Sequence, residues 1–250
     1  MKSVLVVLVV VLVVIAGAWA AANFGFVQTK VRTDTVYGTV RQIVVKSDRG
    51  DVDLVPARRR IEVRESRHWV LSEPEFEWTR RNGVLTLEST CAAVAVILKC
   101  RSDLRVAVPA GVRVTVETQS ADVDLRGTDV RSVRVETHSG DVELDLSGHQ
   151  RLVWADSDAG DVDVVARSAG AVDAQTDSGH VTVDVGGRPR RVVAGSNSGD
   201  VAVAVPRGAY RIRALSDSGD AKVSGLRRDA RSLQSVHART HSGDVTVRAR

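Results

Sequence analysis

Aromatic residues are scarce in this chain of 250 residues and make up only 4% of it. Hydrophobic residues nevertheless supply 43% of the chain, which excludes a disordered polymer and leaves enough apolar material for a sizeable core. Valine dominates this apolar fraction, so the core has to be built from thin, β-branched layers. The composition therefore favours strands over helices.

Cysteine is scarcer still, and the chain has only Cys91 and Cys100, at the two ends of the segment CAAVAVILKC. In an exported chain such an isolated pair predicts a disulfide that closes a local loop. Other metal-ligating side chains do not gather around the pair, so we do not expect a metal site there. A cysteine for lipid attachment is also missing at the end of the apolar N-terminal segment.

A large excess of one charge is missing too, since 35 basic residues face 31 acidic ones and leave a net charge of +4. The two signs are mixed along the chain, which indicates a solvated, charged surface more than a basic patch. We therefore expect no nucleic-acid partner.

Long hydrophobic runs are confined to the N-terminus, where nineteen uncharged positions begin at Val4 and end at Ala22. This length suffices to cross a bilayer as a helix, so the rest of the chain is predicted to be exported. The small-x-small segment Ala18-Trp19-Ala20 leaves cleavage as a signal peptide open. We expect a short cytoplasmic end (1–3), an anchor or signal peptide (4–22) and a linker (23–37). The predicted location is the cell membrane, with a single span and an extracellular C-terminal domain; the alternative is secretion.

One phrase, Ser-Gly-Asp-Val or a close variant, recurs through the second half of the chain. The steps between its glycine slots are 19, 20, 19, 20, 20 and 24 residues, counted from Ala121, which occupies the first slot. The glycines are Gly140, Gly160, Gly179, Gly199, Gly219 and Gly243, and the aspartates are Asp122, Asp141, Asp161, Asp200, Asp220 and Asp244. An earlier instance contains Gly50 and Asp51. A fixed period of this kind is typical of repeat proteins, whose units need their neighbours to bury an apolar face.

Each unit alternates apolar and polar residues on both sides of the phrase, which indicates strand, turn, strand, turn. Glycine tolerates a positive φ, and serine and aspartate bond to nearby amides, so the phrase is turn chemistry. We predict an all-β, single-domain β-solenoid, flattened, with about twenty residues and two short strands per coil. The alternative is an antiparallel meander or sandwich.

Two regions follow from this pattern. Residues 38–117 are expected to form an N-terminal β cap with the first coils, and residues 118–250 the regular solenoid repeats. Asn82-Gly83 predicts a tight hairpin turn inside the cap. The C-terminal end has no comparable cap, so an uncovered coil there could pair with another copy of the chain.

The residues resemble a bacterial adhesin-like β-solenoid family long catalogued as a domain of unknown function. The resemblance covers about residues 38–250 and is carried by IVVKSDRGDVDLV, RNGVLTLES, VAVPAGVRVTVETQSADVDL and serial THSGDVEL-like phrases. It implies an extracellular or envelope-associated domain that is not an enzyme, and it supplies no catalytic residues. Ala121 and His180 depart from the pattern in the glycine and aspartate slots.

The recurring aspartates would form a column of like charges if the coils stack in register. Backbone amides, arginines or a divalent cation could offset their repulsion. The densest candidate for calcium is the set Asp156, Asp158, Asp161 and Asp163, although the nonapeptide of calcium-binding solenoids is missing. No cofactor is otherwise expected.

Catalytic residues are not predicted, because the acidic residues repeat and no serine or cysteine gathers a histidine partner. The leading hypothesis is a membrane-anchored, non-enzymatic adhesion or interaction module that binds a cell-wall glycan or a protein. One alternative is an envelope-stress sensor or regulator acting on a membrane protein. A polysaccharide-active enzyme is a further alternative.

Overall fold

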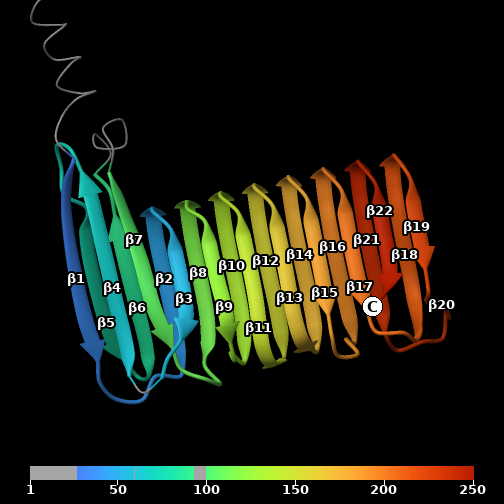
Figure 1. Ribbon diagram of the computed structural model, residues 1–250, viewed down its shortest axis with the longest axis horizontal. Helices are drawn as coiled ribbons and strands as arrows, with labels where there is room; N and C mark the ends of the chain where they lie inside the picture. Colours follow the sequence, from blue (N-terminus) through green and yellow to red (C-terminus); the bar gives the residue numbers. More distant parts are fainter. Residues whose placement is uncertain (1–26, 59, 93–99) are drawn as a thin grey trace, which may run out of the picture.

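A computed structural model describes residues 27–58, 60–92 and 100–250. In these ranges the chain forms 22 strands and no helix, arranged as two sheets of eleven strands that face one another along an elongated stack (Figure 1). The predicted membrane segment, residues 4–22, lies outside the described residues. Within the described ranges there is no helix long and apolar enough to cross a membrane.

The two sheets run the whole length of the stack. In order, the first sheet consists of β1 (Gln28–Val36), β4 (Ile61–Trp69), β7 (Arg101–Val108), β3 (Val52–Pro56), β9 (Val123–Thr128), β11 (Val142–Gln150), β13 (Val162–Ala169), β15 (Val181–Val185), β17 (Val201–Val205), β22 (Val245–Ala249) and β19 (Ala221–Ser224). The second consists of β20 (Arg227–Arg228), β18 (Ala209–Ser218), β21 (Ser235–Ser242), β16 (Arg191–Ser198), β14 (Ala171–Ser178), β12 (Leu152–Ala159), β10 (Ser132–Ser139), β8 (Arg113–Ser120), β2 (Gln42–Arg49), β6 (Val84–Thr90) and β5 (Glu75–Arg81).

The repeats stack as parallel coils, one strand per sheet in each coil. Val133 of β10 lies opposite Val114 of β8 on one side and Val153 of β12 on the other, and all three are buried. The same in-register pairing continues through the first sheet from β9 to β17. The expected solenoid is therefore observed, and the antiparallel meander is wrong for the repeats, whose strands pair in parallel.

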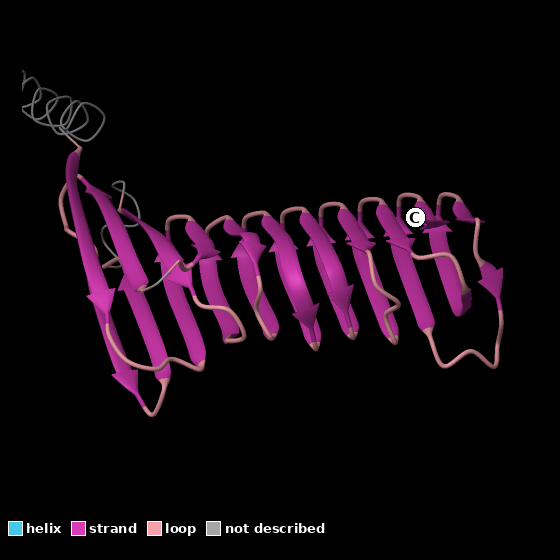
Figure 2. Ribbon diagram, turned by 60° about the horizontal axis from the view of Figure 1, so that its bottom comes forward, coloured by secondary structure: helices cyan, strands magenta, loops and turns pink. Residues whose placement is uncertain are grey.

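Antiparallel pairing is found at one end, where β1, β4 and β5 close the stack (Figure 2). Strand β5 turns into β6 through Asn82 and Gly83, both with positive φ, which confirms the predicted hairpin. The linker expected at residues 23–37 is corrected, because residues 28–36 form β1 and pair along the whole of β4. The alternation of β4 buries its apolar residues, and β1 satisfies the backbone groups of its outer edge.

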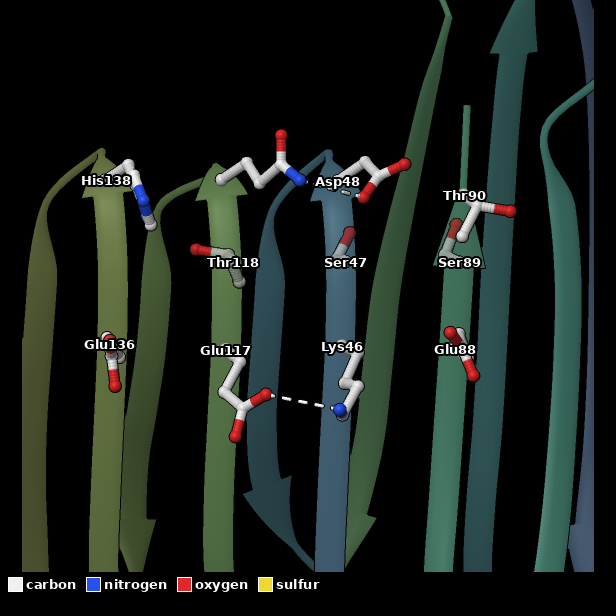
Figure 3. A pocket seen from close by; sticks show the side chains of 11 residues that line it. Lys46, Ser47, Asp48, Glu88, Ser89, Thr90, Glu117, Thr118, Glu136 and His138 are labelled. Atoms are coloured by element: carbon white, nitrogen blue, oxygen red, sulfur yellow. Dashed lines mark hydrogen bonds and ion pairs between the residues drawn. The ribbon is translucent and has the colours of Figure 1, made fainter. Parts of the chain in front are cut away.

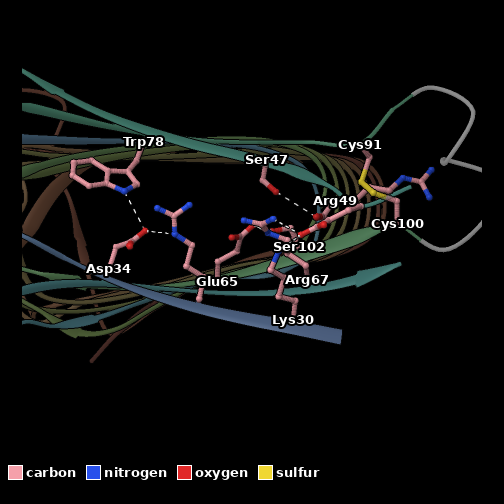
Figure 4. Close-up of polar contacts among 12 residues, drawn as sticks. Lys30, Asp34, Ser47, Arg49, Glu65, Arg67, Trp78, Cys91, Cys100 and Ser102 are labelled. Carbon is pink, nitrogen blue, oxygen red and sulfur yellow. Dashed lines mark hydrogen bonds and ion pairs between the residues drawn. A yellow bond between two sulfur atoms is a disulfide. The ribbon is translucent and has the colours of Figure 1, made fainter. Parts of the chain in front are cut away.

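Polar contacts inside the cap hold its strands together (Figure 4). Glu65 is almost fully buried, accepts a hydrogen bond from the Ser102 hydroxyl at 2.9 Å, and lies 2.8 Å from Nε of Arg67. Cys91 and Cys100 form the predicted disulfide; residues 93–99 between them lie outside the described residues.

The far end of the stack does not follow the order of the chain. The last repeat, β21 and β22, is inserted between the coil of β16 and β17 and the coil of β18 and β19. The terminal coil is therefore β18 with β19, covered in part by β20. The expectation that the C-terminal end of the chain is the uncovered end is corrected: that end is internal, and self-association through the stack end stays untested.

Candidate functional site

The glycines of the recurring phrase form a column along one long edge of the stack, which we call the corner edge. Figure 2 shows this edge as a row of short turns. A Cβ placed on Gly160 would overlap the carbonyl group of Gly140, and one on Gly179 would overlap the carbonyl of Gly160. Gly140 has φ of +140°, a value that side chains disfavour. Glycine is thus required here by the close approach of the preceding coil as well as by the turn.

A ladder of hydrogen bonds runs beside the glycine column and uses the aspartates that follow the glycines. The amide of Asp161 donates to Oδ1 of Asp141 at 2.8 Å, and the amide of Asp141 donates to Oδ1 of Asp122 at 2.9 Å. The same bond joins Asp244 to Asp200 and Asp220 to Asp244. Of the three expected ways to offset the carboxylate column, the structure thus provides the backbone amides.

The two departures from the phrase are accommodated without breaking the stack. His180 replaces an aspartate, and its Nδ1 accepts the amide of Asp200 at 3.0 Å, as a carboxylate would. Ala121, in the first glycine slot, does not share the positive φ of the later glycines, since Asn82 is the only non-glycine with positive φ among the described residues. At the cap end the ladder changes partners, because the Asp51 carboxylate pairs with Arg101 and its amide donates to Asp103.

A second, buried ladder was missed in the sequence. The hydroxyl of Ser157 donates to the carbonyl of Gly140 at 3.1 Å, and the hydroxyl of Thr176 donates to that of Gly160 at 2.8 Å. The equivalent groups of Ser196, Thr240 and Ser216 do the same. The sequence contained a signal for this ladder, because serine or threonine stands three positions before each glycine of the recurring phrase. The corner unit is therefore six residues long, with its first hydroxyl closing the turn from inside.

The four aspartates proposed for calcium do not form one site. Asp156 and Asp158 lie on β12 in the second sheet, whereas Asp163 lies on β13 in the first. Asp161 lies at the corner between them and accepts the amide of His180 at 2.7 Å. In the described part of the chain no three histidine, cysteine, aspartate or glutamate side chains are placed to hold a metal ion. The corner between β12 and β13 thus places Asp156 and Asp158 on the outer face of one sheet and Asp163 on the outer face of the other.

Two of these carboxylates nevertheless lie in unfavourable surroundings. Burial raises the pKa of Asp156, and the charges of Asp158 and Glu136 raise it further, with smaller contributions from two more aspartates. Burial likewise raises the pKa of Asp163, helped by Glu143 and Asp184. The middle coils therefore carry acidic surface that is not neutralised locally.

The outer face of the second sheet is flat and mostly polar near the corner edge. Figure 3 shows Glu88, Lys46, Glu117 and Glu136 on neighbouring strands, with a single ion pair of 3.4 Å between Lys46 and Glu117. The groove that they line is shallow and shared by several strands. Such a face offers extended contact area to a partner.

Arginines gather along the opposite long edge, where the chain returns from the first sheet to the second. Between residues 118 and 186 the chain has fourteen acidic and five basic residues, whereas residues 187–250 have five acidic and thirteen basic ones. Among the arginines at or next to the return turns are Arg41, Arg113, Arg131, Arg151, Arg190, Arg191 and Arg211. The prediction that charges are evenly mixed is therefore wrong. Arginines that are far apart in the sequence lie on this one edge, because coils of nearly constant length return the chain to it each time.

Two sheets of stacked coils, an antiparallel cap at one end and stacked turns define an all-β repeat protein of the solenoid class. The family model named Toastrack DUF4097 matches residues 23–250. The chain belongs to this family, in agreement with the resemblance noted in its sequence.

Several solved structures are similar to this chain at low identity. A "putative adhesin" from Bacteroides fragilis is 14% identical, with 89% of this chain and 97% of that chain covered and a TM-score of 0.41. A "putative cell adhesion protein" from Clostridium sporogenes is 10% identical, with 89% and 100% covered and a TM-score of 0.38. A "putative lipid binding protein" from Parabacteroides distasonis is 9% identical, with 88% and 97% covered and a TM-score of 0.41. No curated protein matches the chain.

Proposed function

We propose that this chain is a non-enzymatic adhesion or interaction module, displayed outside the cell on the envelope and held there by residues 4–22. The single observation that carries the proposal is how the recurrent polar groups are used. The corner carboxylates and the buried hydroxyls bond to the backbone of the neighbouring coil, as between Asp161 and Asp141. These contacts give the recurrent polar groups a role in building the stack.

The shape of the molecule supports the same role. The strands of the second sheet lie in register, so their outward side chains form continuous rows along the stack, as for Arg134 between Thr115 and Trp154. Long flat faces of this kind are what repeat proteins use to bind extended partners. The partner class we favour is a cell-wall polymer. A membrane protein is the partner in the regulatory alternative.

Retention experiments test this proposal. Purified protein is incubated with washed cell-wall fragments and, separately, with detergent-solubilised membranes, and bound material is identified by mass spectrometry. Retention on the wall supports adhesion. Capture of one discrete membrane protein without wall retention would instead establish the regulatory alternative, and release of reducing ends or unsaturated sugars would overturn a non-enzymatic role.

A further inference from the structure

The edge opposite the corner edge, which we call the arginine edge, carries arginines in six of the eight coils from β2 to β18: Arg41, Arg113, Arg131, Arg151, Arg190, Arg191 and Arg211. The coils of β14 and β21 interrupt the row, because Ala171 and Ser235 stand beside Arg191 in the register. Backbone hydrogen bonds fix the stacking of these turns. The Arg113 amide donates to the Arg41 carbonyl at 3.0 Å, and the Arg151 amide donates to the Arg131 carbonyl at 2.8 Å. The row is therefore set by the coil geometry and not by flexible loops.

All seven side chains are exposed. Within the described residues, no carboxylate lies within ion-pair distance of any of them. Other arginines do form ion pairs with carboxylates: Arg105 pairs with Asp53 at 2.5 Å, and Arg101 pairs with Asp103 at 2.6 Å. The arginine edge thus holds positive charge that the protein itself does not neutralise.

A groove follows part of this edge. Its volume is about 550 Å³, and it is lined by Arg41, Arg113, Arg131 and Arg151 together with the turn at residues 110–112. Ser132 and the exposed Leu152, which belong to strands of the second sheet, also line it. Four guanidinium groups therefore border one depression, each able to bind an anionic oxygen pair with two donors.

The row suits a linear ligand better than a compact one. Neighbouring coils are separated by about 4.8 Å, so the seven steps from β2 to β18 extend the row over roughly 35 Å. A single phosphate would engage two or three of these arginines and leave the rest unused. The corner edge carries the aspartate ladder, so a polyanion is repelled from that side.

We propose that the arginine edge binds a linear phosphodiester polymer of the cell envelope, laid along the stack from β2 towards β18. This deepens the proposed function by naming the polymer class and the surface, and it rests on that function for the location of the polymer. Each guanidinium group can donate two hydrogen bonds to one phosphate. The spacing of the coils places these groups along a line that a polymer with repeating phosphates can follow.

Fluorescence anisotropy with labelled poly(glycerol phosphate) of about twenty units tests this directly, using the full chain in a neutral detergent. The test variant is Arg113→Ser/Arg131→Ser/Arg151→Ser, which removes three cations from the groove. The matched control is Arg64→Ser/Lys222→Ser/Arg248→Ser, which removes three exposed cations from the first sheet. Circular dichroism and the melting temperature establish that both variants are folded.

We expect the test variant to weaken binding at least tenfold and the control less than threefold. Added salt should weaken binding to the parent chain progressively, because exposed charges are screened. Equal losses in both variants, or equal binding of neutral dextran, would show that the row has no special role. Vesicles of phosphatidylglycerol and phosphatidylcholine at 3:7 that compete fully would assign the edge to a membrane surface instead. Wall retention that persists in the test variant would overturn this inference and leave the proposed function intact.

Discussion

At the scale of single residues, the structure explains why glycine and aspartate recur together. Gly140 lets the preceding coil approach closely, while Asp141 supplies an acceptor for the amide of Asp161. Aspartate has a Cβ that would not fit at the glycine position, and glycine has no side chain to accept the amide. Both residues are therefore needed to stack one coil on the next.

A methyl group on Gly140 tests the first part. Gly140→Ala is expected to destabilise the fold by about 2–5 kcal/mol, because the backbone is strained and the added carbon overlaps the Ala121 carbonyl. Gly111→Ala is the matched control, since Gly111 also has positive φ but has open space around it. Urea unfolding should give a loss of about 1 kcal/mol there, from backbone strain alone. Equal losses at the two positions would contradict the close-stacking explanation.

The acidic surface of the middle coils predicts a pH-dependent effect at Asp156. Its raised pKa means that the folded state binds the carboxyl proton more tightly than the unfolded state does. The stability that comes from this proton is fully present below the ordinary pKa of 3.8. It is lost as pH rises through the raised pKa of the folded state. Asp156→Asn should therefore raise the melting temperature at pH 7. Thermal melts at a series of pH values should show the two proteins converging on acidification; a difference that grows as pH falls would contradict this.

At the scale of elements, the cap differs from the repeats in how it uses polar groups. Repeat strands bury valines and bond through corner residues, whereas the cap buries Glu65 and Arg67, both on β4, with Ser102 of β7 donating to Glu65. A buried ion pair adds little net stability, but removing one partner leaves the other charge uncompensated.

Arg67→Met is accordingly expected to cost about 3–5 kcal/mol of unfolding free energy. The double variant Glu65→Leu/Arg67→Met should recover most of that loss, because neither charge is then buried alone. Denaturant titrations of the parent, single and double variants provide the comparison. If the double variant is no more stable than the single one, the loss comes from packing.

At the scale of the whole molecule, the insertion of β21 and β22 is the feature that separates chain order from stacking order. Asn197 on β16 lies beside His241 on β21, as the pairing of Ser196 with Thr240 and of Ser198 with Ser242 shows. Asp217 on β18 lies one strand further away. Serial stacking would have placed Asn197 beside Asp217.

Paired cysteines distinguish the two orders. Asn197→Cys/His241→Cys should oxidise to a disulfide, since adjacent strands are about 4.8 Å apart, within the range of disulfide geometry. Asn197→Cys/Asp217→Cys should keep free thiols, because roughly 10 Å separates strands that are not adjacent. Thiol counting and peptide mass mapping after mild oxidation provide the readout. A disulfide in the second pair alone would restore serial stacking.

Much of the fold was predictable because its cause is local and periodic. Local backbone preferences predicted three features that the structure contains. They are the strand with alternating valines around Val133, the corner at Gly140 and the hairpin turn at Asn82-Gly83. The candidate site was less predictable. Whether Asp156 meets Asp163 depends on which sheet each strand joins, and the arginine edge depends on the length of every coil between its members.

The sequence by itself determined the coil, because period-two valines and a glycine corner leave a chain few other ways to bury its apolar side. The tertiary structure alone decided which coil lies on which. Each coil presents nearly the same backbone amides, carbonyls and valines to the coils on either side. The local backbone preferences of a coil therefore do not specify which coil stacks on it. Only the packing of the complete chain, with the longer connection after β19, places the last repeat inside the stack.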